Sequence, residues 1–312
     1  MSQRFARLLN DQDLVDHFLT EVLDFDYSGL NNIAYEIIQG EQGLFHLGPM
    51  AQTLNTSKFR DRKFYKEADR WALRRQIIEE LLSQMRPEND DDICLGKGGA
   101  LPQSGVAAGK QAYILIGLPA SGKSGIGNEV CENYNAIVLD SDYAKRKLPE
   151  FSGYKFGASV VHEESSQIVF GFYDNPRNLD ALNSRVIELG FNVVIPKIGH
   201  DAKSILTLAA SMNEAGYECH LTLVSLLKRE STIRAIHRFH VTKRYVPLGL
   251  IFDGYGNDPC LTYHLLKNKA SDVFKSFGAV STNVPIGDAP VCIDLTEGNP
   301  AGLYGFKENI LI

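Results

Sequence analysis

The order of apolar and polar residues gives the first part of the chain a helical pattern. Residues 12–25 repeat apolar side chains on one helical face, and Asp11 precedes them as a candidate N-terminal cap. The predicted apolar face consists of Leu14, Phe18, Leu19 and Val22. A second amphipathic stretch covers residues 60–85, with its basic residues predicted on a solvated face. The apolar side of that stretch consists of Trp71, Leu73, Ile77, Ile78 and Leu81. We therefore predict an N-terminal helical segment over residues 1–85.

Residues 86–110 break this helical periodicity. They contain prolines, glycines and a run of acidic residues in RPENDDDICLGKGGALPQSGVAAGK. Because these residue types disfavour helices and strands alike, we interpret the stretch as a linker or a loosely ordered connection. Residues 111–312 form the third part of the predicted organisation.

In residues 111–312, short apolar runs of strand length alternate with helical patterns. Five runs have strand character: AYILIG at 112–117, AIVLD at 136–140, FNVVIP at 191–196, CHLTLVSL at 219–226 and PVCIDL at 290–295. Helical stretches such as DAKSILTLAASMNEAG lie between them. Strands joined through helices pair in parallel, and the helices then cover both faces of the sheet. The predicted fold class is therefore α/β, a three-layer fold with a mainly parallel sheet.

Composition narrows the class of protein further. The chain has a formal net charge of −6, which argues against a general nucleic-acid binder. No apolar run is long enough to span a bilayer, and the N-terminus lacks the apolar core of a secretory signal. The five cysteines form no CxxC pair, so we expect reduced, buried thiols in a cytosol and neither a zinc site nor disulfides.

Residues Gly117–Ser124, with the sequence GLPASGKS, match the pattern G-x-x-x-x-G-K-[ST]. The match lies between a predicted strand and a predicted helix, where backbone N–H groups and the helix N-terminus converge on an anion. Lys123 is expected to reach the β- and γ-phosphates of a nucleotide, and Ser124 to bind Mg²⁺. The other expected nucleotide contacts are Gly117, Ala120, Ser121, Gly122 and Gly125. A glycine-rich turn without a ligand is the alternative, and the complete motif in this context favours a P-loop.

Two carboxylates follow the second predicted strand. Asp140 and Asp142 lie just past its carboxyl end, where ligands gather in open parallel sheets. Asp142 is the candidate general base that accepts the proton of an attacking hydroxyl, and Asp140 is a candidate Mg²⁺ ligand. The alternative is that these residues cap the following helix.

From this loop onward the sequence resembles the zeta toxins of bacterial toxin–antitoxin systems, a family of P-loop kinases. The family has the same loop, then an aspartate that ends the second strand, then a basic residue and a Pro-aromatic pair. Here Asp142 and Lys145 are followed by Pro149 and Phe151 in the same register. The resemblance covers about residues 111–255 and implies that Asp142 is the catalytic base.

The resemblance also implies a class of reaction. Family members use ATP to phosphorylate a sugar hydroxyl of UDP-N-acetylglucosamine, and a related plant-pathogen effector phosphorylates NAD. Classical members end the third strand with a Glu-Gly-Thr type motif that helps to hold the acceptor, whereas this chain has Pro196, Lys197 and Ile198 there. Lys197 can bind a phosphate or extend into solvent. This departure leaves the identity of the acceptor open.

The stretch ASVVHEESSQI is predicted as a helix next to the acceptor. On a helix, His162 shares a face with Ser165 and Ser166. Some zeta-like kinases carry a similar His-Glu string along the acceptor pocket, so the resemblance implies substrate contacts from His162 and Glu163. A polar helix surface is the alternative.

The stretch KRESTIRAIHRFHVTKRYVP places basic side chains at helical spacing. Negative charge spreads over the phosphoryl group during transfer, so cations that close over it supply much of the catalysis. Family members place lid arginines in the corresponding late helix and loop. We expect Arg238 and Arg244 to act in catalysis and Arg234 to contact substrate. A solvated basic face is the alternative.

Together these features predict an ATP- and Mg²⁺-dependent kinase domain over residues 111–312. The expected acceptor is a hydroxyl of a small nucleotide-type metabolite, similar to UDP-N-acetylglucosamine or NAD, and the expected role is that of a cytoplasmic bacterial toxin, with export into a host cell left open. Two alternatives remain: a polynucleotide- or RNA-end kinase, which needs a basic groove with aromatic side chains, and an ATP-gated regulatory module without phosphoryl transfer. Residues 1–85 either restrain the kinase in cis, as a separate antitoxin does in the family, or complete its core.

Overall fold

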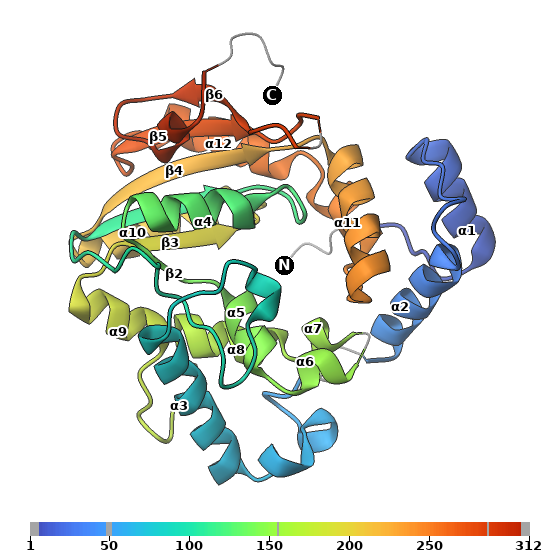
Figure 1. Ribbon diagram of the computed structural model, residues 1–312, viewed down its shortest axis with the longest axis horizontal. Coiled ribbons are helices and arrows are strands. Elements are labelled where there is room, and N and C mark those ends of the chain that lie inside the picture. The colour runs from blue at the N-terminus through green and yellow to red at the C-terminus, as the bar shows by residue number, and fades with distance from the viewer. Residues whose placement is uncertain (1–5, 48–51, 155, 286, 307–312) are drawn as a thin grey trace. The chain divides into compact units, whose positions relative to one another are not determined.

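The computed structural model describes residues 6–47, 52–154, 156–285 and 287–306. Its strands form one sheet in the order β2-β3-β1-β4-β5-β6 (Figure 1). The pairs β2–β3, β1–β4 and β4–β5 are parallel, and β5–β6 is antiparallel. The strands are β1 (Gln111–Ile116), β2 (Ile137–Val138), β3 (Val193–Lys197), β4 (Glu218–Ser225), β5 (Ser276–Ser281) and β6 (Val291–Leu295). The predicted α/β fold with a mainly parallel sheet is confirmed.

Helices alternate with these strands, and further helices precede β1. The α-helices are α1 (Gln12–His17), α2 (Ile33–Leu47), α3 (Glu67–Ser83), α4 (Lys123–Asn133), α5 (Ser141–Lys147), α6 (Glu150–Gly153), α7 (Gly157–Val160), α8 (His162–Phe170), α9 (Leu182–Leu189), α10 (Ala202–Glu214), α11 (Lys228–Thr242) and α12 (Asp258–Lys269). Short 3₁₀ or π turns are η1 (Phe18–Val22), η2 (Ser57–Phe59), η3 (Arg62–Phe64), η4 (Asp90–Asp92), η5 (Leu250–Tyr255) and η6 (Pro300–Leu303). The described part of residues 1–85 therefore contains helices, but residues 23–32 and 52–56 are turns and loops.

Strand β5 is absent from the sequence prediction. Its sequence contains Gly278, and glycine weakens the strand signal. A Cβ at Gly278 would lie 2.1 Å from the side-chain oxygen of Asn299, so the close approach of Asn299 requires a glycine. The Asn299 amide donates to Leu221 O of β4 and to Ser276 Oγ of β5, which ties the two strands together.

The described residues group into two compact units. Unit 1 comprises residues 1–42, 111–130 and 195–312, and unit 2 comprises residues 43–110 and 131–194. The chain passes from unit 2 to unit 1 between residues 110 and 111, but no unit boundary falls at residue 85, and the predicted domain organisation stays a prediction. Residues 1–5, 48–51 and 307–312 of the predicted segments lie outside the described residues.

In unit 1 the N-terminal arm, which we define as residues 6–42, lies beside α11 (Figure 1) and contacts η5 through the rings of Phe18 and Phe252. Arg7 forms a two-pronged ion pair with Asp253 of η5 (2.7 and 2.9 Å), and its guanidinium lies over the rings of Phe18 and Phe252. Glu41 accepts a hydrogen bond from the buried Tyr245 hydroxyl. The arm is therefore an integral layer of unit 1.

The start of the arm tests the first helical prediction. Asp11 caps α1 by accepting a hydrogen bond from the Leu14 backbone N–H (2.9 Å), as predicted. Phe18 and Leu19 are buried, but Leu14 is 45% exposed, so the predicted apolar face is wrong at that position. The α-helix changes to a π-turn at Phe18, which rotates the buried face away from Leu14.

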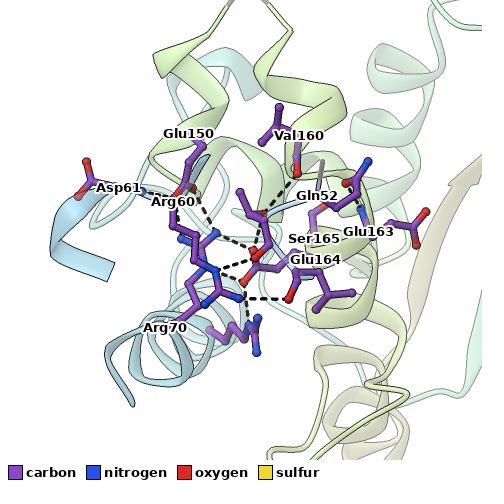
Figure 2. A network of polar contacts seen from close by, with 12 residues as sticks. Gln52, Arg60, Asp61, Arg70, Glu150, Val160, Glu163, Glu164 and Ser165 are labelled. Carbon is purple, nitrogen blue, oxygen red and sulfur yellow. Dashed lines mark hydrogen bonds and ion pairs between the residues drawn. The ribbon is translucent and has the colours of Figure 1, made fainter. Parts of the chain in front are cut away.

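Unit 2 has a buried charge cluster at its centre (Figure 2). Arg70 of α3 is fully buried and donates to both carboxylate oxygens of Glu164 in α8 (2.8 and 2.6 Å) and to Glu150 of α6 (2.8 Å). Glu164 also accepts from Arg74 and from the Thr53 hydroxyl. The prediction of a solvated basic face on this helix is therefore wrong for Arg70 and Arg74, because the buried glutamates 80 to 94 residues further along the chain neutralise them.

Residues 86–110 are packed within unit 2 and are not loosely ordered. The Arg86 N–H donates to Leu101 O, and the Ala100 N–H donates to Leu81 O at the end of α3. Ile93 and Ala100 are buried. Backbone hydrogen bonds to neighbouring elements replace the regular periodicity, which explains why the sequence pattern suggested a linker or a loosely ordered connection.

The five cysteines are free thiols. Cys131, Cys219 and Cys292 are buried, as predicted, and burial raises the pKa of Cys131 and Cys219 to about 12. Cys94 is exposed, so the prediction of a buried thiol is wrong there.

Candidate active site

The loop Gly117–Ser124 connects β1 to α4 within unit 1 and has the conformation that the motif demands. Ala120 and Gly122 have positive φ angles of 61° and 90°, which turn the chain into the first residue of α4. A Cβ at Gly117 would lie 2.5 Å from the Val224 carbonyl oxygen of β4, so only glycine fits there. The local sequence therefore dictates a tight strand-to-helix turn that ends at a helix N-terminus, the geometry of an anion site.

Two hydroxyl side chains that the sequence analysis missed hold this loop in place. Thr282, directly after β5, donates to Ser121 O (2.7 Å), and Ser231 of α11 donates to Pro119 O. Thr282 was missed because it follows the unpredicted strand β5. A hydroxyl at the carboxyl end of a parallel strand is the signal that would have found it.

The residues predicted to contact the nucleotide differ in their exposure to solvent and in their hydrogen bonds. The Lys123 ammonium lies against the loop and donates to Gly117 O (2.7 Å) and Leu118 O (2.5 Å). Ser124 and Gly125 are exposed on the first turn of α4, where a phosphate and its cation can reach them. Ser121 is fully buried, and its hydroxyl is among the few buried side-chain atoms of the described residues that lack a hydrogen-bond partner.

Helix α11 of unit 1 carries the predicted arginines. Arg234 donates to Thr282 O (2.7 Å), the same residue whose hydroxyl holds Ser121 O. The structure thus brings Arg234 to the phosphate loop through Thr282. Arg238 is exposed one turn later, and Arg244 is half-buried just after the helix.

The predicted acceptor contacts occupy separate elements. Lys197 is half-buried at the last position of β3 in unit 1. His162 and Glu163 are exposed in the first turn of α8 in unit 2, and the Glu163 N–H donates to Gln52 Oε1 (3.3 Å). The neighbouring Glu164 is the buried member of the charge cluster, so Glu163 and Glu164 do point in different directions (Figure 2).

In unit 2 the Asp140–Asp142 pair stands at the start of α5. Asp140 is the N-cap of this helix and accepts from the Asp142 N–H (2.9 Å), so the capping role considered for the pair is present. Burial and then the charge of Asp142 raise the pKa of Asp140 to about 6. Asp142 is exposed and forms an ion pair with Lys145 (2.7 Å), the basic residue of the motif.

The donors predicted for Mg²⁺ suit that ion in kind. The Ser124 hydroxyl and the Asp140 carboxylate offer oxygen atoms, which Mg²⁺ prefers. Within the described parts of the chain, no group of three or more His, Cys, Asp and Glu residues is placed to hold a metal by itself.

No helix in the portion of the chain that the structure covers has the length and apolar character needed to cross a membrane.

Comparison with known proteins shows which protein family the chain resembles. Residues 106–253 match the family model of the zeta toxin. The chain is 28% identical over 132 residues to zeta toxins from Enterococcus hirae and from Streptococcus pyogenes. These matches cover 41% of this chain and 44% of each toxin, so the chain spans less than half the length of the curated relatives it matches.

A solved structure supports the fold. A chain from the PezAT chromosomal toxin–antitoxin system of Streptococcus pneumoniae superposes with a TM-score of 0.51 at 15% identity, over 79% of this chain and 88% of that one. The predicted resemblance to the zeta toxins and the P-loop kinase fold are thereby confirmed.

Proposed function

We propose that this chain, whose residues 106–253 match the zeta toxin family model, is a kinase that transfers the γ-phosphoryl group of ATP to a hydroxyl of a small nucleotide-type metabolite. The observation that carries the proposal is the geometry of the loop Gly117–Ser124. Its backbone turns directly into α4, and its lysine lies along it. Asp142, an exposed carboxylate at the start of α5, adds a candidate base.

In the proposed reaction, Asp142 accepts the proton of the acceptor hydroxyl while the hydroxyl oxygen forms a bond to the γ-phosphorus. The bond from the γ-phosphorus to the β–γ bridging oxygen breaks, and ADP leaves with that electron pair. Lys123 neutralises charge on the β- and γ-phosphates. Arg238 and Arg244 stabilise the charge that spreads over the transferring group, and Arg234 contacts substrate from its place beside Thr282.

Ser124 and Asp140 are the residues proposed to hold Mg²⁺ beside the phosphates. When bound, this ion supplies charge neutralisation on the phosphate oxygens. The exposed Ser124 hydroxyl supports the assignment, as does the position of Asp140 directly after β2.

The acceptor is proposed to resemble UDP-N-acetylglucosamine or NAD, with His162, Glu163 and Lys197 as its contacts. We further propose a cytoplasmic toxin that is restrained either by an antitoxin partner or by residues 1–85. The toxin names of the relatives support this role.

The test uses the full chain with ATP, MgCl₂ and separate UDP-sugars, NAD and a short oligonucleotide, with products identified by mass spectrometry. Asp142→Asn is expected to lower turnover by about 10²–10⁴-fold while ATP binding is retained. Asp180→Asn, an exposed aspartate of unit 2, is the matched control and should keep wild-type turnover. Wild-type turnover in Asp142→Asn, or no phosphorylated product with any acceptor, refutes the proposal. A product on the oligonucleotide alone refutes the small-molecule acceptor.

A further inference from the structure

Helix α5, which carries Asp142 in its first turn, has only seven residues. A helix of two turns has little stability of its own, so its position depends on what its side chains contact. The side chains of α5 divide into two faces. Tyr143, Arg146 and Lys147 lie at i, i+3 and i+4 on one face, and Asp142 and Lys145 lie at i and i+3 on another.

The first face of α5 is held by an anchoring segment, which we define as residues 80–97. The Tyr143 hydroxyl donates to Asp90 (2.8 Å), and Arg146 donates to Asp91 (3.0 Å). Lys147 is fully buried, and its ammonium donates to Glu80 (2.7 Å) and to the carbonyls of Cys94 and Lys97. Every polar side chain on this face thus has an acceptor in the anchoring segment.

The anchoring segment is itself fixed within unit 2. Asn89 caps the turn η4 by accepting from the Asp91 N–H (3.0 Å). Arg86 Nη1 lies 3.9 Å from Asp90 Oδ1, and Arg86 Nε donates to Glu132 Oε1 (3.1 Å). Asp90 and Asp91 of this turn therefore accept hydrogen bonds from α5, although Asp91 and Asp92 are exposed.

Asp91 also holds the guanidinium of Arg146, which lies on the same helix as the candidate base. The guanidinium of Arg146 interacts with Asp91 and also with the charges of Asp142 and Asp140. With Asp91 neutralised, Arg146 loses that hydrogen-bonded anionic partner, and the charge of Asp142 remains to attract it, in competition with Lys145. Such an exchange would rotate the first turn of α5 and displace the Asp142 carboxylate.

We infer that Asp91, with Asp90 and Glu80, is a positioning residue for phosphoryl transfer, and that the anchoring segment sets the place of the candidate base. This inference rests on the proposed function. It gives a catalytic purpose to the acidic sequence ENDDD.

The test compares Asp91→Asn with Asp92→Asn, which makes the same charge change in the same turn. Asp92 is exposed, and no hydrogen bond or ion pair of its side chain is found among the described residues, so it is a matched control. Asp91→Asn is expected to lower kcat by about tenfold, since a displacement of about 1 Å at a reacting group costs up to about 100-fold. The KM for ATP should stay unchanged, because the phosphate loop does not depend on Asp91. Asp91→Glu should restore most of the turnover by keeping the acceptor for Arg146.

A second measurement does not depend on activity. Hydrogen–deuterium exchange of the peptide that covers residues 141–148 should be faster in Asp91→Asn than in Asp92→Asn. Equal exchange in the two variants overturns the anchoring role, whatever their turnover. Faster exchange with wild-type kcat overturns the positioning role. Neither result bears on the proposed kinase activity, because that activity is tested separately by the Asp142→Asn variant.

Discussion

Replacing Arg70 by methionine would leave two buried carboxylates, Glu164 and Glu150, without their shared cation. Burial disfavours the ionised form of Glu164, but hydrogen bonds and charge from Arg70, with help from Arg74 and Thr53, hold its pKa at about 2, below the ordinary 4.5. At about 1.4 kcal/mol per pKa unit, that difference corresponds to about 3 kcal/mol of stability. Removing one partner of a buried ion pair costs about 3–5 kcal/mol, so two separate routes give a similar magnitude.

The sign of the pH dependence follows from the same values. Glu164 stays ionised in the folded protein down to about pH 2, whereas in the unfolded chain it takes up a proton near pH 4.5. The unfolded chain therefore binds more protons between these values, and the contribution of Glu164 to stability is lost as the pH falls from about 4.5 to about 2. The difference between the wild type and Arg70→Met should shrink over this window.

The single tryptophan of the chain provides the assay. Trp71 lies on α3 next to Arg70, with its ring 5.2 Å from that of Phe172, so its fluorescence reports the unfolding of unit 2. A loss of about 3 kcal/mol lowers the urea midpoint by about 1–3 M for a slope of about 1–3 kcal/mol per M. Arg75→Met, an exposed arginine on the same helix, is the matched control and should leave the midpoint unchanged.

A double variant tests the physical cause. Glu164→Gln in the Arg70→Met background should cost less than it does in the wild type, because no buried charge of Glu164 then remains to be neutralised. A midpoint of Arg70→Met equal to that of Arg75→Met would refute the reasoning. So would a difference from the wild type that does not change between pH 7 and the acid window.

Three further outcomes are expected. Gly117→Ala should abolish ATP binding in calorimetry, because its Cβ would meet the Val224 carbonyl at 2.5 Å, whereas Gly29→Ala, with nothing within 4 Å, should bind normally. Burial lowers the pKa of His220 to about 4, so stability should rise by up to about 3 kcal/mol as the pH rises from 4 to 6.5, and His220→Gln should flatten that slope in urea titrations. Arg238→Ala should lower kcat by about 100-fold or more at unchanged ATP affinity, with the exposed Arg177→Ala as the control; equal turnover would remove Arg238 from the mechanism.

Features that depend on contiguous residues were readable from the sequence. The phosphate loop occupies eight consecutive positions, and its geometry follows from its glycines and from the strand and helix on either side. The Asp11 cap is equally local, because donor and acceptor lie three residues apart. The parallel sheet followed from apolar runs that helices separate.

Features that depend on distant partners were not readable. Nothing near Arg70 in the sequence indicates that its side chain will form a buried ion pair with Glu164, 94 residues later. The acidic run at residues 90–92 has the composition of a solvated turn, and its role depends on Tyr143 and Arg146 more than 50 residues away. The contacts of Thr282 likewise depend on strand β5, which the apolar pattern did not predict because the strand contains a glycine.

The packing of the N-terminal arm on α11 and η5 has a consequence for how the chain matures on the ribosome. Arg7 can form its ion pair only after Asp253, 246 residues later, has been synthesised. All of unit 2 has been synthesised once residue 194 is made. At about 5–20 residues per second, the arm spends roughly 10–50 s without its partner. Until translation reaches η5, Phe18 of the nascent arm therefore lacks the ring of Phe252, against which it packs in the folded protein.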